Sequence, residues 1–151
     1  MSDWREQYDR MKRWRETMKL ESGDRERLAD HFFAFAQTCY HMADWLGNDP
    51  SKVIPKSEAN KYALSSPALS FCAAICNGSK HAQLEAKHVE LSVTETTVTD
   101  YRFYPNEGRK GSQERAMRRL HLEWQGESVL ALVFADRCIA EWDQLLRSRA
   151  Y

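Results

Sequence analysis

Apolar side chains recur at spacings of three and four in four separate parts of the chain. These parts are about residues 3–21, 24–47, 66–83 and 128–148. Because residues three and four apart lie on one face of an α-helix, the pattern predicts four helices that bury these faces against one another. The connection over residues 51–66 has room for one more short helix, at Ser57–Leu64.

The spacing of apolar residues changes to two near residue 88, which is the period of a β-strand. Apolar residues alternate with polar ones at Val89, Leu91 and Val93, and again at Leu120, Leu122 and Trp124. Residues 94–97 have the composition of a turn, and residues 105–119 have that of a polar, glycine-containing loop. We therefore predict an antiparallel β-meander of two or three strands over about 88–124.

Together these elements predict a mainly α fold, a four-helix bundle with a small antiparallel β-meander inserted before the last helix. The length of 151 residues is close to the commonest size of one domain. No internal repeat, low-complexity tract or linker divides the sequence. We therefore expect a single domain over residues 1–151.

The balance of charged residues excludes the class of strongly basic proteins. The chain has 22 basic and 22 acidic residues, so any contact with nucleic acid has to come from a local patch. The first residues are too charged for a signal peptide, and the longest strongly apolar run, Val129–Ala135, is far too short to cross a bilayer. We expect a cytoplasmic protein that does not bind or span a membrane.

Four cysteines lie within apolar, helix-like stretches, and no CxxC pair is present. They are Cys39, Cys72, Cys76 and Cys138. Their placement favours free thiols that pack as small apolar side chains in a reducing compartment. Zinc sites usually show two close ligand pairs, whereas the metal-binding types here offer one such pair, Cys72 and Cys76, with His41 and His81 as further candidates. We predict no disulfide, no metal and no other cofactor.

The sequence Asn77–His81, NGSKH, is the first candidate for chemistry. Asn77 and His81 are four residues apart and share a face if the helix continues through them. Lys80 could contact a phosphate, and His81 could transfer protons near neutral pH. The alternative is a helix end, in which Gly78 breaks the helix and the two cations lie near its last carbonyl groups.

His41 and Asp44 form the second candidate, late in the second predicted helix. Their spacing of three lets the carboxylate orient the imidazole ring. His41 lies away from the main apolar face, so it is either an exposed side chain or part of a groove between helices. We regard both residues as candidate substrate-binding residues.

The segments DHFFAFAQTCYHMADWL and SFCAAICNGSKHA resemble a set of uncharacterised bacterial helical proteins, whose bundle is similar to the HEPN superfamily (higher eukaryotes and prokaryotes nucleotide-binding). The resemblance covers about residues 24–84. It implies a helical bundle that often acts as a metal-independent ribonuclease, with an arginine, a polar residue and a histidine assembled across a homodimer. Asn77 matches the polar position and His81 the histidine, while Cys76 stands at the arginine position.

The resemblance thus implies a protein of a bacterial defence or stress system that binds RNA or a nucleotide. If it is catalytic, His81 is the general acid/base, Lys80 contacts the phosphate and Asn77 is an orienting donor. The alternative is a non-catalytic module, an inhibitor or assembly subunit with a protein partner. Cys76 at the arginine position and the zero net charge favour this alternative, in which Trp4 and Trp14 are candidate interface anchors.

Overall fold

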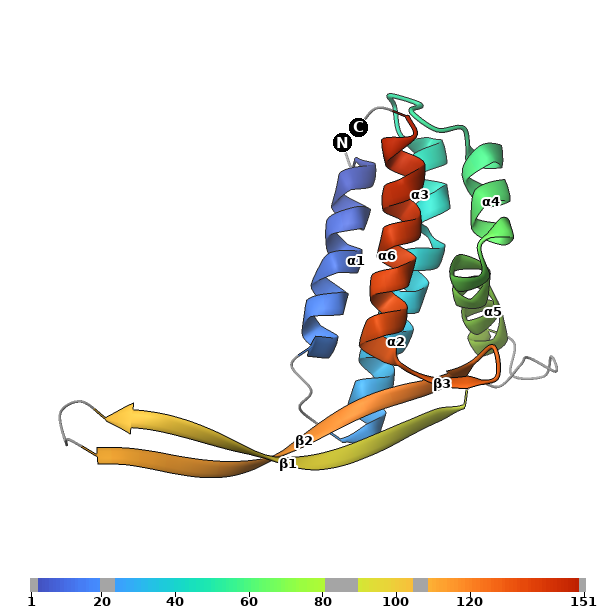
Figure 1. Ribbon diagram of the computed structural model, residues 1–151. Helices are drawn as coiled ribbons and strands as arrows, with labels where there is room; N and C mark the ends of the chain where they lie inside the picture. Colours follow the sequence, from blue (N-terminus) through green and yellow to red (C-terminus); the bar gives the residue numbers. More distant parts are fainter. Residues whose placement is uncertain (1–2, 20–23, 81–89, 105–108, 150–151) are drawn as a thin grey trace.

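The computed structural model describes residues 3–19, 24–80, 90–104 and 109–149. Its elements, in chain order, are α1 (Trp4–Lys19), α2 (Arg25–Tyr40), α3 (Met42–Asn48), α4 (Lys56–Ser65), α5 (Pro67–Lys80), β1 (Leu91–Tyr104), β2 (Arg109–Trp124), β3 (Glu127–Leu130) and α6 (Ala131–Arg147) (Figure 1). The predicted fold class is confirmed: the chain is mainly helical, with a small antiparallel sheet before the last helix. None of the described helices is both long and apolar enough to cross a lipid bilayer.

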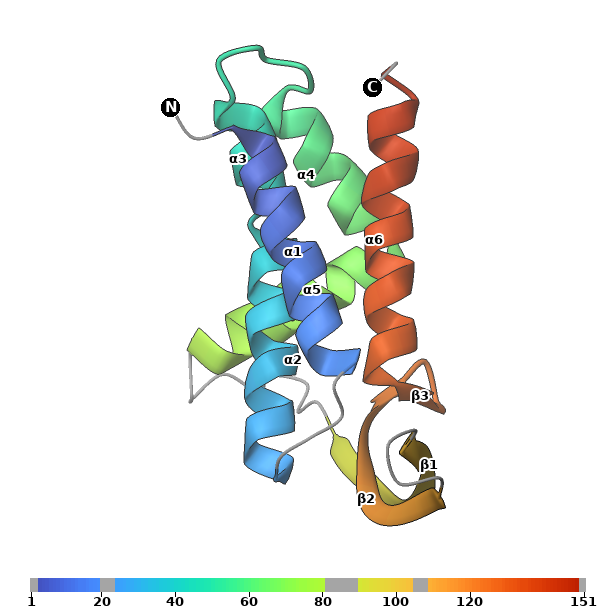
Figure 2. The ribbon, with the colours of Figure 1, turned by 90° about the vertical axis from the view of Figure 1, so that its left-hand side faces the viewer.

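The helices bury their apolar faces around α2. This helix packs against α1, α5 and α6, and α5 crosses it obliquely in Figure 2. Phe32 and Phe35 of α2, Phe134 and Trp142 of α6, and Met11 of α1 are all at most 1% exposed. Full burial of each such side chain contributes about 1.5–3 kcal/mol, so these contacts fix the relative positions of α1, α2 and α6.

The second predicted helix, 24–47, is divided at His41 into α2 and α3. The chain remains close to helical there, since the His41 N–H donates to the Gln37 carbonyl at 3.0 Å and the Trp45 N–H donates to the His41 carbonyl at 3.1 Å. His41 itself has φ −74° and ψ −6°, which turns the chain slightly out of the α2 axis. The junction places the His41 side chain beside the ends of both helices.

Helices α3 and α4 approach closely. The expected short helix at Ser57–Leu64 is confirmed as α4, whose first residue, Lys56, lies against Gly47 of α3. A Cβ atom at Gly47 would lie only 2.7 Å from the Lys56 Cα atom. The absence of a side chain at Gly47 therefore allows this packing.

The sheet has the order β1–β2–β3 and is antiparallel throughout. At its base Leu91 pairs with Leu122 and Val93 with Leu120, so the predicted alternation over these residues is confirmed. A two-residue turn joins β2 to β3, with φ 54° at Gln125 and φ 77° at Gly126. Two successive positive φ angles are typical of the type I′ turn, whose twist suits a hairpin.

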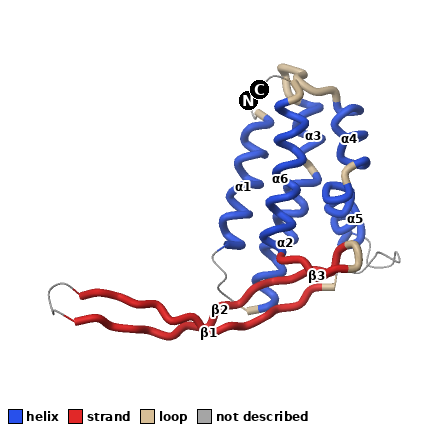
Figure 3. The backbone as a smooth tube through the Cα atoms, viewed as in Figure 1, coloured by secondary structure: helices blue, strands red, loops and turns tan. Residues whose placement is uncertain are grey.

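Two predictions within the β region are wrong. Most of the expected loop at 105–119 belongs to β2, and the expected turn at 94–97 lies inside β1. The two strands form a long ribbon that extends beyond the helices (Figures 1 and 3). Where no helix covers a ribbon, neither face needs apolar residues, so the alternation that reveals a strand is missing.

Two further predictions change, one about the start of the last helix and one about the tryptophans of α1. The last helix begins at Ala131 rather than near residue 128, because residues 127–130 pair with β2 as strand β3. Trp4, expected as an interface anchor, is only 5% exposed and packs in the core. Trp14 is half-buried and stacks on His31, with ring centroids 6.0 Å apart. Both tryptophans therefore hold α1 to the bundle.

Candidate functional site

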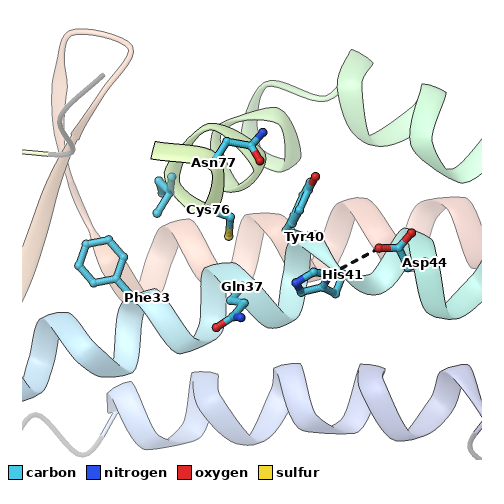
Figure 4. Close-up of a pocket in the computed structure, with 8 residues that line it drawn as sticks. Phe33, Gln37, Tyr40, His41, Asp44, Cys76 and Asn77 are labelled. Carbon is cyan, nitrogen blue, oxygen red and sulfur yellow. Dashed lines mark hydrogen bonds and ion pairs between the residues drawn. The ribbon is translucent and has the colours of Figure 1, made fainter. Parts of the chain in front are cut away.

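A pocket lies between the α2–α3 junction and the C-terminal half of α5 (Figure 4). Its volume is about 490 Å³. It is lined by Phe33, Gln37, Tyr40, His41, Asp44, Ile75, Cys76 and Asn77. A cavity of this size suits a small organic ligand, because ligand pockets commonly measure about 300–1,000 Å³.

One wall of the pocket is a second stripe on α2, beside its buried face. Phe33, Gln37 and Tyr40 follow one another at spacings of four and three, so they share a helical face. Phe33 and Tyr40 are large side chains, yet they are 36% and 37% exposed. Because α5 covers this stripe only in part, two aromatic rings remain open to the pocket.

The Asp44 carboxylate joins two basic side chains at the same wall. Its Oδ2 atom lies 3.5 Å from Nδ1 of His41, and its Oδ1 atom accepts a hydrogen bond from Nζ of Lys56 at 2.8 Å. The bond from Lys56, and then that from His41, lowers the pKa of Asp44 below its usual value. An ionised Asp44 can accept a hydrogen bond from Nδ1 of His41 and so orient the imidazole ring.

The opposite wall comes from the last turns of α5. Ile75 is buried, Cys76 is half-buried and Asn77 is exposed, so these three consecutive side chains differ in their access to solvent. Burial raises the pKa of the Cys76 thiol to about 11, with a smaller contribution from Cys39. Cys76 is therefore a neutral thiol at pH 7, and the Asn77 amide is the polar group that α5 contributes to the lining.

The structure brings three of the five predicted site residues into this pocket. Asn77 lies across from His41 and Asp44 in Figure 4, and His41 is the groove-lining residue of the two alternatives left open by the sequence. Lys80 is the last residue of α5, three residues after Asn77. His81 lies outside the described residues, so its predicted role stays a prediction.

The aromatic and amide residues on the α2 wall were not among the site residues predicted from the sequence. The signal was present, since Phe33, Gln37, Tyr40 and Asp44 continue one helical face at spacings of four, three and four. It was obscured because the neighbouring stripe around Phe32 is more apolar. Lys56, the partner of Asp44, comes from a separate helix and could not be assigned from spacing.

Of the metal-binding residues named from the sequence, the three that the structure describes, His41, Cys72 and Cys76, do not meet at one place. His41 and Cys76 line the pocket, whereas Cys72 is not among the lining residues. Cys72 lies instead in the core, with its Sγ atom 3.6 Å from that of Cys138. None of the four cysteines, all of which lie within the described residues, is in a disulfide.

Comparisons with known proteins assign no role to this pocket. Protein-family models, curated proteins and solved structures were each compared with the chain, and none of them matches it. The role of the pocket is therefore inferred from its own residues and geometry.

Proposed function

We propose that this chain is a HEPN-like protein of a bacterial defence or stress system that binds a nucleotide or an unpaired segment of RNA, and that it is a metal-independent ribonuclease. The observation that carries the proposal is the position of Asn77 across one pocket from the His41–Asp44 pair. These residues are more than thirty positions apart in sequence, and the fold of α2 against α5 brings them together.

The pocket offers the groups that a nucleobase needs. Tyr40 and Phe33 present partly exposed rings, and base–aromatic stacking is worth about 1–3 kcal/mol per base. Gln37 carries an amide group, which both donates and accepts hydrogen bonds and so matches the edge of a base. The volume of about 490 Å³ is large enough for one base with its ribose.

We assign the sugar–phosphate part of the ligand to basic and amide side chains of the predicted site. In the proposed roles His41, held by Asp44, contacts the ribose or phosphate, and Asn77 donates to a phosphate oxygen. Lys80 supplies the positive charge for the phosphate, in place of the arginine whose position Cys76 occupies. His81 takes the proton from the attacking 2′-hydroxyl group and returns a proton to the leaving 5′-oxygen.

The second candidate function is a non-catalytic inhibitor or assembly subunit, and the β1–β2 ribbon favours it. The ribbon extends past the helices, where a protein partner could pair with a strand edge or cover a face (Figure 1). In this alternative the protein makes its essential contacts through the ribbon, and RNA is left intact.

The proposed function also includes a homodimer, because HEPN active sites are usually assembled from two copies. Light scattering on the purified protein should give twice the chain mass. A value equal to the chain mass at the concentration of the assays would contradict this part of the proposal.

Calorimetric titration with adenosine monophosphate and with a short single-stranded RNA tests the pocket directly. Tyr40→Ala should weaken binding about 5- to 150-fold, the equivalent of one lost stacking contact. Asn77→Ala should weaken binding as well, while Asn60→Ala, an exposed amide on α4, serves as the matched control and should not. The proposal is contradicted if Tyr40→Ala binds with the same affinity as the wild type, or if the wild type does not bind.

A further inference from the structure

Three thiols from three helices meet in the core. Cys39 of α2, Cys72 of α5 and Cys138 of α6 are each 0% exposed, and their Sγ atoms all lie within 4.8 Å of one another. We refer to these three side chains as the thiol triad. The sequence predicted four separate thiols that act as small apolar side chains, so this convergence arises from how the helices pack.

The spacing of the sulfur atoms suits one bound metal ion. Sulfur ligands lie about 2.3 Å from zinc, so two of them in a tetrahedral arrangement are about 3.8 Å apart. The Cys72 and Cys138 sulfurs are already 3.6 Å apart. Shifts of about 1 Å at most would place all three sulfurs around one ion with this geometry. A disulfide would need a separation of about 2.05 Å.

The donor set determines which ions fit. Among the described residues, one group has its ligand atoms close enough together to hold an ion, and this group is the thiol triad. It contains no carboxylate and no imidazole. Thiolates select soft cations, of which Cu(I) and Zn(II) are the usual examples. Calcium and magnesium prefer oxygen ligands, so this set excludes both ions.

The buried indole Nε1–H of Trp142 has no oxygen or nitrogen acceptor among the described residues, and it lies close enough to the Cys39 thiol to interact with it. The indole is therefore available to donate to a sulfur ligand of a bound ion.

We propose that the thiol triad is a binding site for one thiophilic cation, Cu(I) or Zn(II), held by sulfur from α2, α5 and α6. Each thiol that becomes a thiolate on binding releases one proton to solvent. The bound ion links three helices far apart in sequence, so it should raise the stability of the bundle. Cys76 lies one helical turn after Cys72 but lines the pocket and is not part of the triad.

Titration of the full chain under anaerobic, reducing conditions tests the site. Cu(I) is supplied from a chromophoric Cu(I) chelator and Zn(II), in a separate arm, from a zinc indicator. The wild type and Cys76→Ala should each take up one ion of at least one of these metals per chain. Cys72→Ala and Cys138→Ala should lose this uptake, with circular dichroism showing that each variant remains helical.

X-ray absorption on the loaded wild type keeps the test independent of variants that fail to fold. It should show sulfur neighbours at about 2.3 Å and no light-atom shell of comparable weight. Failure of the wild type to take up either ion overturns the proposal. So does uptake that persists in Cys72→Ala and disappears in Cys76→Ala, or a Cys72–Cys138 disulfide found by non-reducing mass spectrometry in metal-treated protein.

Discussion

The Asp49 carboxylate accepts a hydrogen bond from the backbone N–H of Trp4, with 3.1 Å between Oδ2 and N, across 45 residues of sequence. Trp4 is the first residue of α1, so its N–H has no carbonyl partner within the helix. The other oxygen of Asp49 accepts from the Ser51 N–H at 2.9 Å. One carboxylate thus joins the start of α1 to the connection between α3 and α4.

Asp49→Ala should destabilise the protein. The variant loses the acceptor for the first N–H of α1, and loss of a capping side chain typically costs about 0.5–2 kcal/mol in the free energy of unfolding. Urea unfolding followed by circular dichroism measures the change. Asp9→Ala removes an exposed carboxylate from the same helix and is the matched control. Equal losses in the two variants would show that Asp49 does not act as a cap.

The same carboxylate should make stability depend on pH in the acid range. The hydrogen bond from the Ser51 side chain, followed by those from the backbone of Trp4 and Ser51, lowers the pKa of Asp49 below its usual value. A carboxyl group with a lowered pKa in the folded state stabilises the protein above its unfolded pKa, which is about 3.9. This contribution is lost as the pH falls through the folded pKa.

Unfolding measured from pH 7 down to pH 2 should therefore show a loss of stability that begins near the unfolded pKa. Asp49→Asn keeps the shape of the side chain but cannot titrate, so its stability should fall less steeply over the same range. Parallel curves for the two proteins would contradict the assignment. The difference between the curves, rather than either curve alone, isolates Asp49 from the other carboxylates.

Gly47→Ala tests the close packing of α3 on α4. Helix propensity alone predicts that alanine stabilises a helical position by about 1 kcal/mol over glycine. Against this, the new Cβ atom would lie 2.7 Å from the Lys56 Cα atom, which belongs to backbone that cannot rotate away. Overpacking of this kind costs about 1–3 kcal/mol, so we expect net destabilisation by thermal unfolding. A stabilised variant would mean that α4 can move outward without loss.

His81→Ala separates the catalytic role from the helix-end role. Loss of a positioned acid/base should reduce RNA cleavage about 10²- to 10⁴-fold and leave thermal stability nearly unchanged. If His81 only balances the charge of a helix end, the change should cost about 0.3–1 kcal/mol of stability and alter no activity. Cleavage in the presence of EDTA, measured together with thermal unfolding, decides between them. His121→Ala, on β2 outside the pocket, is the matched control.

The sequence predicted the elements whose apolar faces meet a core. Phe32 and Phe35 mark α2 because burial imposes helical spacing on them. The outer part of the β1–β2 ribbon shows no such regular spacing of apolar residues in the sequence. There the strands pair through their backbones from Thr97–Ala116 to Tyr104–Arg109, and backbone pairing requires no apolar pattern.

The candidate sites also differ in how much of each could be predicted from the sequence. Asn77, His41 and Asp44 could be named from the sequence, because each lies in a local polar cluster on an apolar helix. The thiol triad could not be, since it depends on the rotation and depth of α2, α5 and α6 relative to one another. Those quantities are set by packing over the whole bundle and are not present in the spacing of any one helix.

The β1–β2 ribbon also changes how the molecule scatters X-rays. A compact chain of 151 residues has a radius of gyration of about 15 Å. The radius of gyration weights each atom by its squared distance from the centre of mass, so a narrow projection raises it more than its share of the mass suggests. With the ribbon extending beyond the helices, a monomer of this chain scatters as an elongated particle whose pair-distance distribution carries a long tail.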